Sequence, residues 1–302
     1  MSDPVWTAFL VNLLFWSGMA AGAVAFDGLL DVTGAAWASP LRALARRFRR
    51  FLPISVVLYA AGFAMARTFH WRDAAAFAAS AVAAFSPPVV FLIVYPVAWS
   101  LIAIDVVMSL EPGWASTLFP AYVFAANVYA AAGAVAIAAS LSRRRDVLDA
   151  ARSRDLGTVL LGFALIWIYF TWTQVLVIWY GNLPAESAYV AKRLSGGWTA
   201  VAWFVFVARC ALPVLVLLPR AGRTRLPLAL VGATVVAGFW MECWLMVVPA
   251  RPGAFTASAT AATTAVFCVL FAAAWSWPPP RPRPRAAPLQ SATAGGGPSH
   301  SL

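Results

Sequence analysis

The stretch PVVFLIVYPVAWSLIAIDVVMSLEP, residues 88 to 112, combines a long apolar run with two carboxylates, Asp105 and Glu111. A run of about 20 apolar residues is long enough for a helix to cross the hydrocarbon core of a bilayer. Across the whole chain 62% of the residues are hydrophobic, 11% are charged, and the mean hydropathy is +0.79. We therefore predict an all-α fold, a polytopic bundle of transmembrane helices.

The same kind of apolar run recurs along the chain. Spanning helices are expected near residues 5–30, 51–69, 88–110, 115–141, 157–181, 198–218, 227–249 and 258–277. The Ala-rich segment 73–85 is shorter, since a helix of that length rises only about 20 Å against a core of about 30 Å. Residues 1–277 are predicted to form the bundle. Residues 278–302, rich in Pro, Ala, Gly and Ser, are predicted to be a disordered cytoplasmic tail.

The arginines are concentrated between the apolar runs, in segments 42–50, 142–155, 220–225 and 281–285. This is the distribution of cytoplasmic loops, so the formal net charge of +11 does not indicate nucleic-acid binding. The first two segments lie on one side only if an even number of helices separates them. Segment 73–85 would supply the additional crossing, which favours about nine helices with the amino terminus outside.

The candidate residues are ionisable side chains within the predicted helices or at their ends: Asp27, Asp31, Asp105, Glu111, Arg209 and Glu242. Charges inside a membrane cost roughly 2.5 to 3.5 kcal/mol each on insertion scales, so they usually face the bundle interior and mark a path or a site. Asp105 and Glu242 lie on helices that end outside, at a similar distance from the end, and should share a depth. These residues are candidates for a proton path.

Structural roles are the alternative for each of these residues. Asp105 or Glu242 could pair with Arg209 in a buried ion pair without any conduction. Asp31 and Glu111 lie near helix ends and could be ordinary interfacial residues, and Asp27 could point toward the inner interface.

Motifs for cofactors are missing from the sequence. Cys210, Cys243 and Cys268 occur singly, and the two histidines, His70 and His300, do not form a pair that could hold a haem across a bundle. No metal site, nucleotide loop or catalytic nucleophile motif is encoded. Electrons, if they are involved, must come from a partner.

Several segments together resemble one protein family. They are FLVNLLFWSGMAAGAVAF, TGAAWASPLR, AIDVVMSLEPGWASTLF, DLGTVLLGFALIWIYFTWTQVLVIWYGNLPAE and WLMVVP, and the similarity runs from about Trp6 to Pro249. The chain is similar to the NrfD-like membrane subunits of alternative complex III, a bacterial quinol:cytochrome c oxidoreductase. Within that family the MSLEP and WYGNLP motifs point to the F-type subunit.

The resemblance implies a multi-pass protein of the bacterial inner (cytoplasmic) membrane that works in a respiratory chain. Its expected partners are membrane lipid, a second NrfD-like subunit, an iron-sulfur subunit and a multihaem cytochrome c. The subunit would bind no redox cofactor by itself and would contribute a quinone-facing or proton-conducting bundle, with quinone or quinol bound at the level of the complex. Asp105, Glu111 and Glu242 match the family's pattern, and Thr173 and Gln174 match a polar pair.

The chain also departs from the family's pattern. Histidine often occupies the positions of Asp31, Gly113 and Arg209 in the family, and none of these is histidine here. Two other functions therefore stay open. One is a proton-coupled membrane transporter, in which the buried acids would bind ions, and the other is a non-conducting membrane anchor of a redox complex.

Overall fold

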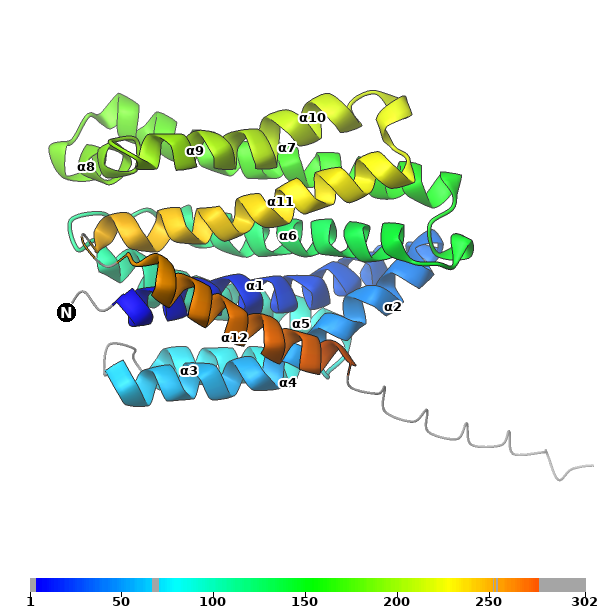
Figure 1. Cartoon of the computed structure of the whole chain (residues 1–302), viewed down its shortest axis with the longest axis horizontal. Helices are drawn as coiled ribbons and strands as arrows, with labels where there is room; N and C mark the ends of the chain where they lie inside the picture. Colours follow the sequence, from blue (N-terminus) through cyan, green and yellow to red (C-terminus); the bar gives the residue numbers. More distant parts are fainter. Residues whose placement is uncertain (1–3, 67–70, 252, 254, 277–302) are drawn as a thin grey trace, which may run out of the picture.

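The structure is a computed structural model that describes residues 4–66, 71–251, 253 and 255–276. Within these residues the chain is all-α, and its helices lie roughly parallel or antiparallel in one elongated bundle (Figure 1). The predicted tail and both histidines lie outside the described residues.

Seven of the described helices are long and apolar enough to cross a membrane. They are α1 (Pro4–Val32), α5 with its extension (Pro88–Leu110), α6 (Phe119–Leu141), α7 (Ala150–Gly181), α9 continued into α10 (Trp198–Leu217), α11 (Arg225–Val247, extended to Ala250) and α12 (Ala257–Ser276). Seven helices of this length and composition indicate a multi-pass membrane protein.

Two further helices, α3 (Leu52–Ala66) and α4 (Trp71–Ala83), have 15 and 13 residues. Both are shorter than the roughly 20 residues that a spanning helix needs, so the expected count of eight or nine spans is not confirmed. The Ala-rich segment is nevertheless helical, and α4 packs on both α3 and α5. Two short helices, α2 (Ser39–Phe48) and α8 (Pro184–Arg193), connect longer ones.

Two predicted helix starts were misplaced. The helix predicted from residue 115 begins at Phe119, because the Pro112–Gly113 turn precedes it and Pro120 occupies its first turn. The helix predicted from residue 157 begins at Ala150, where the Asp149 side chain accepts a hydrogen bond from the Arg152 backbone N–H at 2.8 Å. An aspartate at this position is a preferred N-cap, and it extends α7 into the arginine-rich loop.

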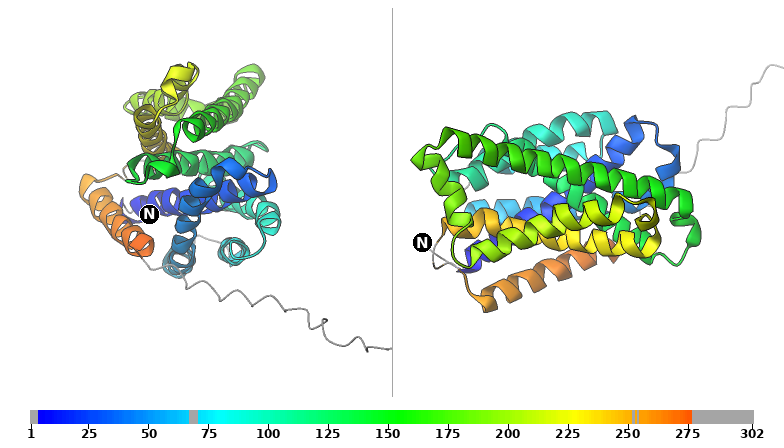
Figure 2. Two further views of the ribbon diagram at one scale, coloured as in Figure 1. Left: turned by 90° about the vertical axis from the view of Figure 1, so that its right-hand side faces the viewer. Right: turned by 90° about the horizontal axis from the view of Figure 1, so that it is seen from above.

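The centre of the bundle consists of α1, α6 and α11, with α3 and α4 at one edge and α7, α9 and α10 at the other (Figures 1 and 2). Glycines bring these central helices together. A Cβ added to Gly22 on α1 would lie 2.3 Å from the Asn127 carbonyl oxygen on α6, and one added to Gly232 on α11 would lie 2.6 Å from the Gly133 carbonyl oxygen. Small residues permit such close backbone contact between membrane helices.

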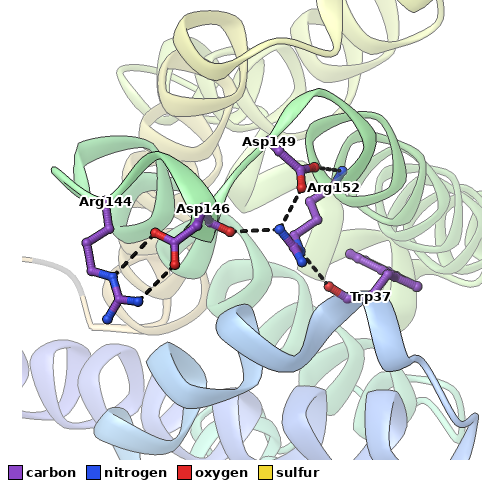
Figure 3. Close-up of polar contacts among 5 residues, drawn as sticks. All are labelled: Trp37, Arg144, Asp146, Asp149 and Arg152. Atoms are coloured by element: carbon purple, nitrogen blue, oxygen red, sulfur yellow. Dashed lines mark hydrogen bonds and ion pairs between the residues drawn. The ribbon is translucent and has the colours of Figure 1, made fainter.

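Three arginine-rich segments meet at one end of the bundle, on the right in Figure 1. Arg152, in the first turn of α7, donates its Nε–H to the Trp37 carbonyl at 2.9 Å and joins the start of α7 to the segment after α1 (Figure 3). Arg225 Nη2 donates to the Ser142 carbonyl at 2.6 Å and adds the loop before α11. Helix α2, which follows Trp37 in the chain, lies at the same end (Figure 1). The segments 42–50, 142–155 and 220–225 therefore share the end that we call the arginine-rich end.

The turn between α4 and α5 lies at this same end. The Arg49 guanidinium carbon is 5.3 Å from the centre of the Phe85 ring, which lies in that turn. The pair α3 and α4 thus leaves the arginine-rich end and returns to it (Figure 1). The helices α3, α4, α5 and α6 run between segments 42–50 and 142–155. The positive-inside rule requires an even number of crossings between two arginine-rich segments on the same side of a membrane.

Candidate functional site

The most deeply buried charges in the described part of the chain form one ion pair. Arg209 Nη1 lies 2.6 Å from Glu242 Oε2, and the two side chains are 0% and 1% exposed. Arg209 comes from the helix α9–α10 and Glu242 from α11. Because neither side chain reaches solvent, each charge depends on the other for neutralisation.

The rest of the carboxylate is bound by aromatic donors. Tyr122 on α6 donates its hydroxyl hydrogen to Glu242 Oε1, and Trp167 on α7 donates its Nε1–H to the same oxygen at 2.8 Å. Four helices therefore meet at the Glu242 side chain. Such a network holds the carboxylate in one orientation, since a displaced acid would lose several charge-assisted hydrogen bonds at once.

The guanidinium of Arg209 is held by backbone and by rings. Its Nη2 donates to the Ala126 carbonyl at 3.1 Å. The rings of Tyr129, Trp167 and Phe239 have their centres 5.0 to 5.5 Å from the guanidinium carbon. Aromatic faces attract a desolvated cation, so this enclosure partly replaces the water that Arg209 lacks.

Local backbone structure makes room for Arg209. The residue lies in a π-helical turn, Val207–Ala211, between α9 and α10. Opposite it, a Cβ added to Gly238 of α11 would lie 2.7 Å from Arg209 Cγ. π-helical turns of this kind occur often at functional sites, and here the turn and the glycine together admit a long side chain between packed helices.

A pocket of about 440 Å³ extends from the ion pair toward the end opposite the arginine-rich end. We call it the aromatic pocket. Its walls come from α6, α7, α8, α9, α11 and the segment that precedes α6, and they include Trp114, Tyr122, Trp167, Tyr189, Arg193 and Glu242. Trp172 and Trp203, each 61% exposed, also line the pocket, so it opens on the outer surface between α7 and α9.

A second cluster of charges lies beside the outer part of the aromatic pocket. Lys192 Nζ donates to Glu111 Oε2 at 2.7 Å, and Arg193 Nη1 lies 3.5 Å from Glu111 Oε1. Tyr189 stacks on Trp114 with ring centres 3.6 Å apart, and burial raises the pKa of Tyr189 to about 12. These contacts fix α8 across the pocket.

The third cluster lies at the arginine-rich end, where α1 meets α2. Arg42 Nε and Arg46 Nε donate to the two oxygens of Asp27 at 2.8 and 2.9 Å, and Arg42 also pairs with Asp31. Burial lowers the pKa of Arg42, but its hydrogen bonds to the two aspartates outweigh burial and leave the pKa raised. Asp27 and Asp31 therefore anchor α2 to α1.

The candidate residues from the sequence thus fall into separate groups. Glu242 pairs with Arg209, whereas Asp105 joins neither residue and its half-buried carboxylate has no ion pair or hydrogen bond among the described residues. Asp105 lies in a second π-helical turn, Ala103–Val107. Gln174 lines the aromatic pocket, while the Thr173 hydroxyl donates to the Tyr169 carbonyl of its own helix at 2.7 Å.

Four contributors were missed at the sequence level: Tyr122, Trp167, Lys192 and Arg193. An aromatic residue in an apolar run carries no signal that its polar edge faces an acid on another helix. Lys192 and Arg193 did carry a signal, because they are adjacent charges in a short segment outside the arginine-rich loops.

No protein-family model matches this chain, and the comparison with curated proteins found no match either. Among the described residues, no group of three or more His, Cys, Asp and Glu side chains could hold a metal ion.

Proposed function

We propose that this chain is an integral membrane subunit of a quinol:cytochrome c oxidoreductase of the alternative complex III type, in the cytoplasmic membrane of a bacterium. It contributes a helix bundle that faces quinone, and the redox cofactors belong to partner subunits. Those partners are a second NrfD-like subunit, an iron-sulfur subunit and a multihaem cytochrome c. In this proposal α3 and α4 also cross the membrane, giving nine crossings with the amino terminus outside.

The observation that carries the proposal is the aromatic pocket with an acid in its wall. The pocket is open to the outer surface of the bundle at Trp172 and Trp203, and Glu242 lines it. A membrane-soluble hydroquinone has an apolar body and two hydroxyl groups, so it needs a mostly apolar site with a few oriented polar groups. The resemblance of residues 6–249 to NrfD-like subunits supports the same conclusion.

The test is isolation of the tagged full-length chain from the membranes of its own host. We expect c-type haem and iron-sulfur absorption to co-purify with it, together with quinol:cytochrome c activity. Deleting the chain should abolish that activity. Recovery of the chain without any haem-bearing partner, under conditions where other respiratory complexes remain intact, would contradict the proposal.

A second candidate, a membrane anchor without conduction, is favoured by one observation. Glu242 pairs with Arg209, and Asp27 pairs with Arg42 and Arg46, so each of these acids already has a positively charged partner within the chain. The complex carrying Glu242→Gln together with Arg209→Met distinguishes the two functions. A quinone-facing role predicts an assembled complex with reduced quinol turnover, whereas an anchor predicts an assembled complex with normal turnover.

A further inference from the structure

Another pocket, of about 440 Å³, lies at the arginine-rich end and shares no lining residue with the aromatic pocket. We call it the arginine pocket. Its walls come from α1, from α2 and the single turn Arg49–Phe51 that follows it, and from the start of α5 with the turn before it. The polar residues that line it are Asp27, Asp31, Arg42, Arg46, Arg49 and Ser86.

The charges in this lining do not cancel. Three arginines and two aspartates line the pocket, which leaves one formal positive charge. Both oxygens of Asp27 already accept hydrogen bonds, from Arg42 and Arg46, and Asp31 pairs with Arg42. The surplus positive charge is therefore that of Arg49.

Arg49 and Ser86 bring unused donors to opposite walls of the arginine pocket. Arg49 is half-buried and has no ion pair or hydrogen bond among the described residues. Its contact with the Phe85 ring uses no N–H group in a conventional hydrogen bond, so its donors remain available to an anion. Ser86 is exposed, and its hydroxyl likewise has no hydrogen-bond partner in the described part of the chain.

Exposed apolar side chains lie next to this pocket. Phe85 precedes Ser86 in the turn and Val89 follows it at the start of α5, and they are 60% and 55% exposed. Val89, Ile93 and Val97 are exposed and recur every four residues, so they lie on one face of α5. At 1.5 Å per residue this apolar stripe runs about 12 Å away from the arginine-rich end.

We propose that the arginine pocket binds the headgroup of an anionic phospholipid that carries one phosphodiester charge, in the leaflet at the arginine-rich end. The phosphate oxygens accept hydrogen bonds from Arg49 and Ser86, and an acyl chain lies along the apolar stripe of α5. The bound headgroup joins the turn before α5 to the turn after α2. This inference does not depend on the proposed function, because it requires only that the bundle lies in a membrane.

Charge favours this ligand over its two nearest alternatives. A zwitterionic phospholipid carries its own cation beside the phosphate, so it gains less from the surplus charge of Arg49. Free phosphate would use the same donors, but it carries between one and two negative charges at neutral pH and makes no use of the apolar stripe. A single phosphodiester with hydrocarbon chains matches both the charge and the adjacent surface.

The test is thermal unfolding of the full-length chain in dodecylmaltoside, with dioleoylphosphatidylglycerol, dioleoylphosphatidylcholine or inorganic phosphate added. A ligand that binds only the folded state raises the melting temperature in proportion to the logarithm of its concentration above the Kd. We expect phosphatidylglycerol to raise the melting temperature by about 3 °C at ten times its apparent Kd. Phosphatidylcholine should raise it less, and millimolar phosphate should not raise it.

Arg49→Gln should remove most of the shift caused by phosphatidylglycerol, and Arg47→Gln is the matched control. The Arg47 guanidinium carbon is 5.5 Å from the centre of the Trp275 ring, and Arg47 does not line the arginine pocket. Each variant therefore loses one charge and one ring contact at the same end of the bundle, but only Arg49→Gln should lose the response to the lipid.

Ser86→Glu tests the opposite wall without touching an arginine. Ser86 is exposed, so the variant should fold, and the added carboxylate should abolish the shift by repelling the phosphate. If Arg49→Gln fails to fold, Ser86→Glu decides the question alone, and an undiminished shift in Ser86→Glu would overturn the inference.

Three other outcomes would also overturn it. Equal shifts with phosphatidylglycerol and phosphatidylcholine would show that the headgroup charge is not recognised. An equal loss in Arg47→Gln and Arg49→Gln would show general attraction to a positive surface. A saturable shift with inorganic phosphate that phosphatidylglycerol does not exceed would assign the pocket to a free anion.

Discussion

Replacing Glu242 by glutamine should strongly destabilise the isolated chain, because it leaves the Arg209 charge buried without a counter-charge. The two side chains are 1% and 0% exposed, so water cannot substitute for the missing carboxylate. Breaking one side of a buried ion pair typically costs about 3 to 5 kcal/mol. At roughly 2 °C per kcal/mol for a chain of this length, the melting temperature should fall by about 6 to 10 °C.

The double variant Arg209→Met and Glu242→Gln should recover much of this loss. Methionine fills part of the guanidinium's space without a charge, and glutamine can still accept the hydrogen bonds from Tyr122 and Trp167. The difference between the double variant and the two single variants gives the coupling energy of the pair. A buried pair predicts a coupling of more than about 1 kcal/mol.

The assay is thermal unfolding in detergent, followed with a thiol-reactive fluorophore. Cys243 is 2% exposed and adjacent to Glu242, so its labelling reports opening of this region. Cys210 and Cys268 are replaced by alanine to remove their signal, since Cys210 is half-buried and Cys268 is exposed.

Asp146→Asn is the control for the same chemical change at a surface ion pair. Arg144 and Asp146 are 79% and 63% exposed, so this variant should keep the wild-type melting temperature (Figure 3). If Glu242→Gln melts like the wild type, or if the double variant is no more stable than Glu242→Gln alone, the ion pair does not have the role described here.

Three further predictions concern packing, Asp105 and topology. Gly22→Leu should prevent α1 from packing on α6 and lower the yield of folded protein, as measured by size-exclusion chromatography, whereas Gly162→Ala should be tolerated because an added Cβ there meets nothing within 4 Å. Asp105→Asn should leave the melting temperature of the isolated chain unchanged, because its carboxylate has no ion pair or hydrogen bond among the described residues. Lowered turnover in the assembled complex would then indicate a relay role, and unchanged turnover would exclude one. Cysteines placed at Arg144 and Pro184 should be labelled from opposite sides of the membrane, the first from the cytoplasm; labelling of both from one side would contradict the topology.

The helical class and most of the long helices were predictable from the sequence, because an apolar run of about 20 residues in a membrane protein has few alternatives to a helix. Helix ends were less predictable. The start of α7 depends on the Asp149 cap, which lies among charged residues that resembled an ordinary loop. The short helices α3 and α4 were uncertain because length alone does not separate a short crossing from an interfacial segment.

The buried charges show most clearly where prediction from the sequence ends and the tertiary structure decides. The sequence by itself determined that Asp105, Arg209 and Glu242 would lie on long apolar helices, because each is flanked by apolar residues on a predicted span. Only the tertiary structure decided which acid pairs with Arg209. That choice depends on the rotation of α9–α10 and α11 about their axes, on the π-helical turn at Arg209 and on the space left by Gly238. A nearly uniform apolar helix has no polar face to set its rotation, so packing between helices sets it instead.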